Sequence, residues 1–467
     1  MDARHDIVLI APHADAIRAL LDGSGEERAA YMLFGTVRIG ADPWTGNERL
    51  RLVSHRFVGI PDRDVVSRSP VHVTWSTESF MRLLGEAGRD GLMPAIVHTH
   101  PGGPPVFSDQ DDRNEKDLLR IVSNRSGDGH GFASIVLGGD GSICARHWTS
   151  PDRSEACERV LVSGRRLILH GVGAMPVEEM LDRQARLFGP AFNPLVRSLR
   201  VGVVGCGGTG SPTAMLLARL GIGHLLLVDD DTIELANLNR VYGSRLDDVR
   251  ANASKVDILA REILAAELGV QVATFRRWVG DADVRDAMRS CDVIFGCTDD
   301  HDGRLFLNRL AYYYGIPIID MGVRIIPKSK DRPYEMAGRV TVVAPGTPCL
   351  LCRGLIDPVR ARDEALRRTD LKEFERRKAE AYVSGGGDPA PVVVTFTTET
   401  ACMAVNELLQ ALTAFRGEGG MKPERRRRFD AVEERTTTCS PRQECEQCAT
   451  PRIWGRADVT PFLHRIG

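Results

Sequence analysis

The chain has 467 residues, and this length predicts about two to four domains rather than one core. Hydrophobic residues make up 43% of it and charged residues 27%, a composition that excludes an intrinsically disordered protein. The formal net charge of −2 argues against a general electrostatic attraction to nucleic acid or to membranes.

The first part of the chain, up to about residue 155, has the mixed pattern of an α+β unit. Helical patterns are expected at 11–21 and 77–87, and Ser108 is expected to cap a further helix. Strand patterns recur around these helices, at 31–39, 50–60, 71–75, 94–97, 132–137 and 142–148.

Two histidines follow the short apolar strand at 94–97. His98 and His100 alternate by two, so in a strand both imidazoles point to the same side. Asp111, in the first turn of the next helix, can add an oxygen ligand. Two histidines and one carboxylate leave the fourth position of a tetrahedral zinc ion for water, which predicts a hydrolytic site. For the two histidines alone, hydrogen bonds within a core are the alternative.

The string HTHPGGPPVFSDQD, with both histidines, resembles the JAMM (MPN-domain) metalloproteases, which cleave after the C-terminus of ubiquitin or ubiquitin-like proteins. The resemblance implies zinc ligation by the two histidines and Asp111, and stabilisation of the oxyanion by Ser108. It also implies an upstream glutamate as general base, for which Glu27 is the best candidate and Glu26 its neighbour. Without a glutamate in reach, the unit would bind a ubiquitin-like tail without cutting it.

A second kind of unit begins near residue 199. An apolar strand at 201–204 runs into the turn GCGGTG, and an apolar helix at 214–220 and a second strand at 225–228 follow. Glycines let backbone N–H groups approach a phosphate at the start of the helix. The glycines expected to bind nucleotide are Gly205, Gly207, Gly208 and Gly210. By itself the pattern is a dinucleotide-binding fingerprint, and it leaves an NAD-dependent dehydrogenase open as an alternative.

Polar residues after the second strand predict a site for a triphosphate. Asp229 can hold a ribose, and Asp299, after a later strand, can hold Mg²⁺. Adenylation of a carboxylate builds charge on an α-phosphate, which nearby cations offset, whereas hydride transfer has no need of them. The set expected to bind ATP and Mg²⁺ is Asp229, Asp231, Asn237, Arg240, Lys255 and Asp299.

The segments GCGGTGS, DDDTIELANLNR and CTDDHDGR, together with Lys255, resemble the ubiquitin-activating family in its small ThiF/MoeB-like form. The resemblance runs from about residue 178 to the C-terminus and implies ATP-dependent adenylation of a ubiquitin-like C-terminus. It also implies that Arg183 reaches the ATP of a partner subunit, and hence a homodimer. Val241 replaces the family's glutamine and Asp300 a common asparagine, which predicts phosphate contacts that differ in detail.

Two CxxC pairs lie far apart in the sequence and predict a closed, structural zinc site. Its expected ligands are Cys349, Cys352, Cys445 and Cys448. The charged segment at about 357–391, which contains Gly-Gly-Gly, looks like the crossover that passes over the substrate's tail in relatives. It has no cysteine to form a thioester; Cys402 is expected in the core, and Cys439 is a remote alternative. We therefore expect direct transfer of the acyl adenylate to another acceptor.

The remaining features concern the chain's environment. The basic run KPERRRR at 422–428 is expected to be a solvated loop, with a nucleic-acid patch as the alternative. No apolar run reaches the ~18–20 residues that span a bilayer, and the N-terminus lacks a signal-peptide pattern. With eleven cysteines and no disulfide framework, we expect a cytoplasmic protein with reduced thiols.

These patterns predict an α/β protein: an α+β JAMM/MPN-like domain at 1–155, a linker at 156–175, and a doubly wound, Rossmann-like adenylation domain with a zinc knuckle at 176–467. The expected function is bifunctional: zinc-dependent cleavage at a ubiquitin-like tail and Mg-ATP-dependent adenylation of the same tail. A conjugating enzyme, as in bacterial antiphage systems, is one acceptor. A sulfur donor that makes a thiocarboxylate on a sulfur-carrier protein, for cofactor or siderophore synthesis, is the other. A tail-binding adaptor without catalysis is the alternative from another class.

Overall fold

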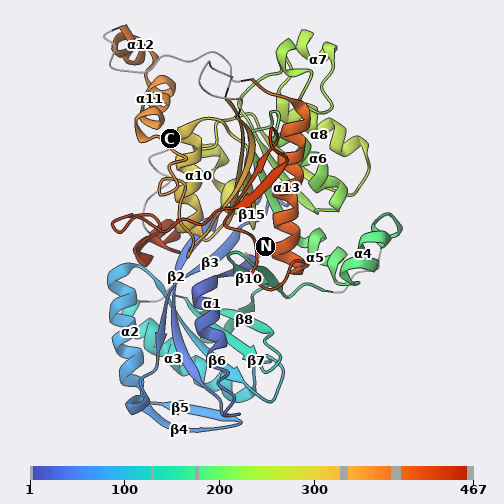
Figure 1. The fold of residues 1–467 in the computed structure, drawn as a ribbon. Coiled ribbons are helices and arrows are strands. Elements are labelled where there is room, and N and C mark those ends of the chain that lie inside the picture. The colour runs from blue at the N-terminus through green and yellow to red at the C-terminus, as the bar shows by residue number, and fades with distance from the viewer. Residues whose placement is uncertain (1–3, 128–130, 174–177, 327–334, 380–390, 460–467) are drawn as a thin grey trace. The chain divides into compact units, whose positions relative to one another are not determined.

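The computed structural model describes residues 4–127, 131–173, 178–326, 335–379 and 391–459. It divides into two compact units, which are described separately (Figure 1). The first unit runs to Gly173 and also includes Tyr313–Gly315 and the described segment from Pro451; the second unit holds the rest. Among the described residues, no helix has both the length and the apolar character needed to cross a bilayer.

The first unit is built on a nine-stranded mixed sheet in the order β11-β10-β1-β3-β2-β6-β7-β8-β9. The pairs β10–β1, β1–β3 and β6–β7 are parallel, and the other pairs are antiparallel. The strands are β1 (Arg4–Ile10), β2 (Ala29–Ile39), β3 (Arg49–Gly59), β6 (Met93–His100), β7 (Phe132–Gly138), β8 (Ile143–Ser150), β9 (Arg153–Ala156), β10 (Arg159–Ser163) and β11 (Leu167–His170). A separate antiparallel hairpin consists of β4 (Val65–Ser69) and β5 (His72–Trp75).

Helices cover both faces of this sheet, because its central strands are apolar on both sides. On β2, Tyr31 belongs to the apolar cluster under α2 (Thr77–Asp90) and α3 (Asp109–Ser126), whereas Met32 belongs to the cluster under α1 (Ala11–Arg18). Burial on both faces explains why these strands read as nearly continuous apolar runs. The expected α+β unit is confirmed.

The segment 156–175, expected from the sequence to be a linker, instead contributes strands to the first sheet. β10 pairs in parallel with β1, and β11 pairs antiparallel with β10. Val160, Leu161 and Val162 are buried, so this segment is part of the core. The first unit therefore extends to Gly173. These strands are short, and charged residues lie in and around them, such as Arg159 at the start of β10, so the sequence shows no clear strand pattern here.

The second unit contains an eight-stranded sheet in the order β14-β13-β12-β15-β16-β17-β18-β19. The first five strands of this order are parallel, and the rest are antiparallel. The strands are β12 (Arg200–Val204), β13 (His224–Val228), β14 (Gln271–Phe275), β15 (Val293–Gly296), β16 (Ile318–Ile326), β17 (Glu335–Val343), β18 (Glu424–Arg428) and β19 (Glu433–Thr436). The chain order reverses between β12 and β15, where open α/β sheets bind their ligands. This confirms the doubly wound architecture.

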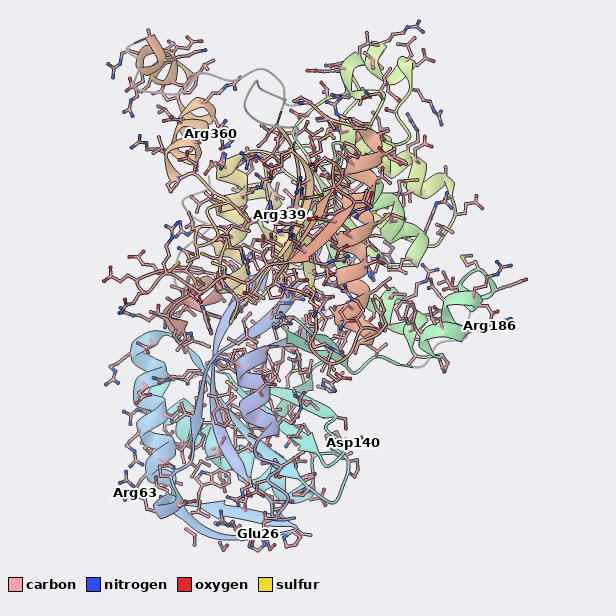
Figure 2. All side chains as sticks on the ribbon, viewed as in Figure 1. Glu26, Arg63, Asp140, Arg186, Arg339 and Arg360 are labelled. Atoms are coloured by element: carbon pink, nitrogen blue, oxygen red, sulfur yellow. The ribbon has the colours of Figure 1, made fainter. Side chains whose placement is uncertain are left out.

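Helices surround this sheet and carry charged side chains outward (Figure 2). Arg186 of α4, with 78% of its side chain exposed, contrasts with Arg339 of β17, with 14% exposed. The helices are α4 (Asp182–Phe188), α5 (Phe192–Ser198), α6 (Gly210–Leu220), α7 (Leu246–Arg250), α8 (Lys255–Ala265), α9 (Arg285–Arg289), α10 (His301–Tyr314), α11 (Pro358–Thr369), α12 (Leu371–Ala379) and α13 (Val394–Thr413). Of the expected crossover, α11 and α12 are described, whereas 380–390, with its three glycines, lies outside the described residues.

The basic run at 422–428 forms a strand, not the expected loop. β18 lies between β17 and β19 in the sheet, with its arginines in ladder pairs. Each arginine faces a carboxylate, as in the pairs Arg425–Glu407, Arg426–Glu424, Arg427–Glu399 and Arg428–Asp430. The positive charge of this strand is thus matched within the unit, which weakens the nucleic-acid interpretation.

Candidate active sites

In the first unit, β6 and α3 bring the predicted zinc ligands together. β6 extends to His100, so both histidines lie within the strand and point to the same side, their ring centroids 5.0 Å apart. α3 begins after Ser108, whose hydroxyl accepts a hydrogen bond from the Asp111 N–H while the Asp111 carboxylate accepts one from the Ser108 N–H. This capping box fixes the start of the helix beside the strand.

The geometry of these side chains suits a metal ion. His98 Nε2 lies 3.2 Å from Asp111 Oδ1, and His100 Nε2 lies 4.0 Å from Asp111 Oδ2. One ligand atom from each of the three residues lies within 4.8 Å of the others. His98 Nε2 is buried, and its contact with Asp111 Oδ1 lacks hydrogen-bond geometry, as expected for two atoms that bind the same metal ion. Burial and the neighbouring His98 lower the pKa of His100, which favours the neutral, ligating imidazole.

Glu27, rather than Glu26, faces the histidines. Glu27 is 9% exposed, and its Oε1 lies 3.9 Å from His100 Nε2. Glu26 instead forms an ion pair of 2.9 Å with Arg68. Burial, with a smaller contribution from the charge of Asp111, raises the pKa of Glu27 to about 7 against the opposing effect of His98. A carboxyl group with such a pKa can take up and release a proton near neutral pH.

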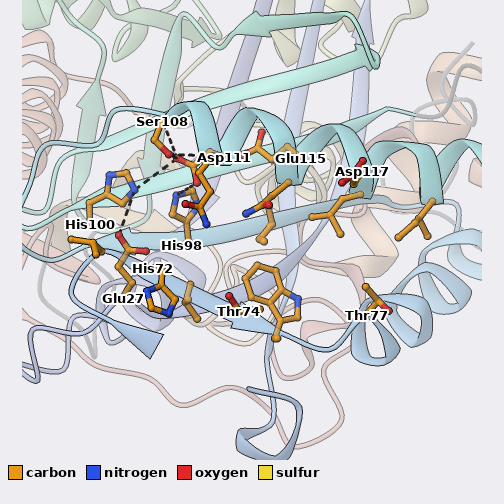
Figure 3. Close-up of a pocket in the computed structure, with 18 residues that line it drawn as sticks. Glu27, His72, Thr74, Thr77, His98, His100, Ser108, Asp111, Glu115 and Asp117 are labelled. Atoms are coloured by element: carbon orange, nitrogen blue, oxygen red, sulfur yellow. Dashed lines mark hydrogen bonds and ion pairs between the residues drawn. The ribbon is translucent and has the colours of Figure 1, made fainter. Parts of the chain in front are cut away.

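A cavity of about 270 Å³ opens beside these residues, between α3 and the β4–β5 hairpin (Figure 3). Glu27 and the two histidines lie at one end of the view, and Thr77 lies at the other. Along its length the cavity has both apolar and acidic walls, which include Val73, Trp75, Ile96, Glu115, Asp117 and Leu118. Apolar and acidic walls of this kind can contact the side chains of an extended peptide.

In the second unit, a cavity of about 670 Å³ lies at the switch point of the sheet. Gly205, Gly207 and Gly208 line it, whereas Gly210 does not. A Cβ at Gly210 would lie 1.8 Å from the Gly205 carbonyl oxygen, so this glycine allows close packing at the start of α6. Gly205 has φ +86°, which favours glycine. Gly205, Gly207 and Gly208 therefore face the cavity, whereas Gly210 packs against the backbone of Gly205.

The acidic residues of this cavity differ in the hydrogen bonds and ion pairs that they form. The carboxylate of Asp229 accepts hydrogen bonds from the N–H groups of Cys206, at 2.6 Å, and Asp231, at 2.8 Å. Asp231 in turn lies 2.6 Å from Lys255 Nζ. Burial, outweighing the opposing charge of Lys255, raises the pKa of Asp229 to about 6. Asp229 therefore anchors the glycine loop to the end of β13 as well as lining the cavity.

Asp299 lines the same cavity next to Asp300, but only Asp300 is engaged by neighbouring groups. Asp300 accepts hydrogen bonds from the Gly303 N–H at 2.8 Å and from Trp278 Nε1 at 3.4 Å. In the part of the chain that the structure describes, no ion pair or hydrogen bond involves the Asp299 side chain. Its charge does contribute to the raised pKa of Lys255. A carboxylate without a hydrogen bond or ion pair is available to a cation such as Mg²⁺.

The remaining predicted residues differ in whether they line the cavity. Asn237, Arg240 and Lys255 line the cavity, and Lys255 is 9% exposed. Burial lowers the pKa of Lys255, but Asp229 and Asp231 outweigh it and raise the pKa overall. Arg183, on α4, does not line this cavity.

The crossover segment supplies walls of this cavity that sequence reasoning missed. Arg367 and Arg368, on α11, line it together with Trp278. The Arg368 guanidinium lies 3.6 Å from the centroid of the Trp278 ring and 2.7 Å from Asp302 Oδ2. Glu364 accepts hydrogen bonds from two N–H groups at the start of α10. No local motif marks these residues, because folding brings together segments far apart in the sequence.

The four cysteines of the CxxC pairs converge. Sγ–Sγ distances are 3.6 Å for Cys349 and Cys445 and 3.5 Å for Cys352 and Cys448. A tetrahedral zinc ion with Zn–S bonds of about 2.3 Å requires Sγ–Sγ distances of about 3.8 Å, close to these values. The Arg442 N–H donates to Cys352 Sγ at 3.2 Å, a hydrogen bond that supports a metal-bound thiolate. The residues therefore fit the predicted zinc site with four cysteine ligands.

The two other cysteines considered as nucleophiles lie in different surroundings. Cys402 lies on α13, and burial, followed by the charge of Glu399, raises the pKa of its thiol. A raised pKa opposes the thiolate that a thioester-forming cysteine needs. Cys439 Sγ lies 3.7 Å from the Cys352 carbonyl oxygen, beside the cysteine cluster.

Comparison with family models assigns both parts of the chain. Residues 181–450 match the model of the ThiF family, and residues 11–150 match that of the prokaryotic homologs of the JAB domain. The chain thus joins a JAB-like domain to a ThiF domain, which confirms the fusion that the two motif sets predict.

Curated relatives match the second part. The SAMP-activating enzyme E1 of Haloferax volcanii is 30% identical over 177 residues, which are 37% of this chain and 61% of that protein. The ubiquitin-like modifier-activating enzyme 5 of Oryza sativa subsp. japonica is 29% identical over 171 residues, 34% of this chain and 38% of that protein. The crystal structure of E. coli MccB with ATP aligns with a TM-score of 0.43 at 17% identity, over 58% of this chain and 75% of that one. The chain thus spans less than two thirds of the length of these two curated relatives.

Proposed function

Since the chain belongs to the ThiF family, we propose that its second unit uses ATP and Mg²⁺ to adenylate the C-terminal carboxylate of a ubiquitin-like protein. The observation that carries this proposal is the meeting of a glycine loop, several cationic side chains that include Arg240 and Lys255, and the carboxylate of Asp299 in one cavity. The matched relatives, a SAMP-activating enzyme and a ubiquitin-like modifier-activating enzyme, support the choice of substrate.

In this proposal the residues of the second unit have separate tasks. Backbone N–H groups at Gly207 and Gly208 bind phosphate, and Arg240 and Lys255 offset the charge that builds on the α-phosphate as pyrophosphate leaves. Asp299 would hold Mg²⁺. None of the described residues that line the cavity favours NAD over ATP. An NAD-dependent dehydrogenase would also leave Arg240 and Lys255 without a role.

We propose in addition that the first unit is a zinc-dependent peptidase for a ubiquitin-like tail. His98, His100 and Asp111 would hold the ion, which when bound polarises the scissile carbonyl and lowers the pKa of a bound water. Glu27, with a pKa near neutrality, takes the proton from the attacking water and delivers it to the leaving amine. The Ser108 hydroxyl, which donates to Asp111 Oδ2 at 2.7 Å in the structure, would turn from that carboxylate to donate to the oxyanion.

The two activities act in sequence on one tail: cleavage exposes a C-terminal carboxylate, and adenylation activates it. The described part of the crossover, 358–379, holds no cysteine, and burial disfavours the thiolate of Cys402. This supports direct transfer to an external acceptor, either a conjugating enzyme, as in an antiphage system, or a sulfur donor. Arg183 does not line the nucleotide cavity of its own chain. In this proposal it completes the ATP site of the partner subunit in a cytoplasmic homodimer.

The test measures each activity in variants of the other site. ATP–pyrophosphate exchange is assayed with candidate carrier proteins, and tail cleavage with the same proteins carrying a C-terminal extension. Asp299→Ala should abolish exchange and spare cleavage, and His100→Ala should do the reverse. If either variant lost both activities while folded, the two-site model would be wrong. Exchange with none of the carriers would favour an adaptor, and NAD(H) binding without a response to ATP would favour a dehydrogenase.

A further inference from the structure

A buried arginine behind the first cavity contacts the start of α3. Arg146 lies on β8, and 11% of its side chain is exposed. Its Nη1 lies 2.5 Å from Asp112 Oδ1, and its Nε donates a hydrogen bond of 2.8 Å to Glu115 Oε2. The guanidinium also lies over the ring of Phe107, 3.9 Å from its centroid. Arg146 thus contacts three side chains that come from one short stretch of the chain.

That stretch contains two residues of the proposed zinc site. Phe107 directly precedes Ser108, and Asp112 directly follows Asp111. The approach to α3 is a Gly/Pro-rich loop, and Ser108 is exposed at its end. The contacts of Arg146 therefore hold the backbone on both sides of the Asp111 carboxylate, which faces His98 at 3.2 Å.

The chemistry of the contacts requires an arginine. Glu115 is 3% exposed, and its Oε2 also accepts a hydrogen bond of 2.6 Å from Trp148 Nε1. A planar guanidinium can donate in its plane to two carboxylates while one face stacks on an aromatic ring, which a lysine ammonium cannot do. Without a cation here, Glu115 would keep a buried carboxylate with no charge to balance it.

We propose that Arg146 is a positioning residue for the third metal ligand. It acts through Phe107 and Asp112, fixing the first turn of α3 so that the Asp111 carboxylate meets the two histidines of β6. This inference rests on the proposed zinc site and extends it to a residue that takes no part in the chemistry. It predicts that metal affinity, rather than fold stability alone, depends on Arg146.

Zinc binding by the full-length chain tests the proposal. The wild type is expected to hold two zinc ions per chain, one at the cysteines, and His98→Ala only the latter. Titration against a chromophoric chelator should show that Arg146→Met lowers the affinity of the His-Asp site about 10- to 100-fold, the range for losing a residue that orients a metal ligand. The cysteine site should keep its affinity. Phe107→Leu removes only the stacked ring and should give a smaller loss, and Arg146→Lys a partial recovery over Arg146→Met.

Arg49 provides a matched control. Its side chain is 1% exposed and forms ion pairs with Asp6, at 2.5 Å, and Asp42, at 3.5 Å, neither of which belongs to α3 or the loop before it. Arg49→Met should therefore destabilise the fold without changing zinc affinity. Wild-type affinity in folded Arg146→Met, or an equal loss in Arg49→Met, would overturn the proposal. If the wild type itself held zinc only at the cysteines, with His98→Ala indistinguishable from it, the metal site and this inference would both fall.

Discussion

Substitution of two glycines near the nucleotide cavity can distinguish an effect on ATP binding from an effect on the stability of the fold. Gly207 lines the second cavity, and a Cβ built on it has no heavy atom within 4 Å. Gly210 does not line the cavity, and its Cβ would lie 1.8 Å from the carbonyl oxygen of Gly205. Alanine at each position adds the same methyl group, which meets no neighbour at Gly207, in the loop, but meets the backbone at Gly210, the first residue of α6.

The expected magnitudes follow from these distances. Gly207→Ala should change the free energy of unfolding by no more than about 0.5 kcal/mol, as for a substitution that meets no neighbour. Its methyl group occupies space that phosphate needs, and the loss of one charge-assisted hydrogen bond, about 1.5–3 kcal/mol, lowers ATP affinity about 10- to 150-fold. Gly210→Ala must move the carbonyl oxygen of Gly205 to at least 3.0 Å, an overpacking that should cost about 1–3 kcal/mol of stability.

Urea unfolding and isothermal titration with Mg-ATP measure the two quantities on the same preparations. We expect Gly207→Ala to keep the free energy of unfolding of the wild type but to bind ATP weakly. We expect Gly210→Ala to have a reduced free energy of unfolding. If Gly207→Ala bound ATP as tightly as the wild type, phosphate would not approach this face of the loop. Unchanged stability in Gly210→Ala would show that the packing at the start of α6 relaxes at no cost.

Three further predictions concern the metal, the carboxylates and pH. Cys349→Ser should reduce the zinc content by one ion per chain, measured by atomic emission, whereas Cys439→Ser should leave it unchanged, because Cys439 lies outside the converging four. Asp299→Asn should slow ATP–pyrophosphate exchange by about 100-fold or more, and a rate near that of the wild type would contradict the assignment of Mg²⁺ to Asp299. Burial, with smaller effects of His5 and Arg38, lowers the pKa of His147 from 6.5 to about 4. The folded state thus favours neutral His147, and this stability is present above pH 6.5 and is lost as the pH falls toward 4, by about 2 kcal/mol at pH 5. Denaturation at pH 8 and pH 5 should show this difference, and His147→Leu should reduce it; an unchanged pH profile would contradict a neutral, buried imidazole.

The convergence of the three proposed zinc ligands was predictable because their signal is local. His98 and His100 need only a strand between them, and Asp111 only a helix that begins at Ser108, and the structure supplies both. The fold class was predictable for a similar reason, since apolar runs and the glycine turn recur in the order that a doubly wound sheet requires. The strands at 159–163 and 167–170 were missed because they are short and flanked by charge.

The choice between Glu26 and Glu27 depends on strand register, which the sequence does not reveal. β2 pairs antiparallel with β6 so that Ala29 stands opposite His98. Continued by two residues, this register sets Glu27 opposite His100, with its side chain on the same side as the histidine. A shift of one residue turns a side chain to the other face, so Glu26 must point away. The sequence could name the pair of glutamates, and only the pairing of the strands distinguishes them.

Asp300 shows how a departure from a family pattern acquires a physical reason. As an asparagine replaced by aspartate, it predicted altered phosphate contacts. In the structure, which does not test this expectation, Asp300 accepts hydrogen bonds from Trp278 and from the start of α10, and Arg368 of α11 lies 3.7 Å from its carboxylate. The charge at this position adds to that of Asp302 in attracting the arginine. Among the described residues, the neighbouring Asp299 has no ion pair or hydrogen bond, and α11 forms a wall of the cavity. Any movement of α11 away from the cavity has to separate Arg368 from two carboxylates and uncover Trp278.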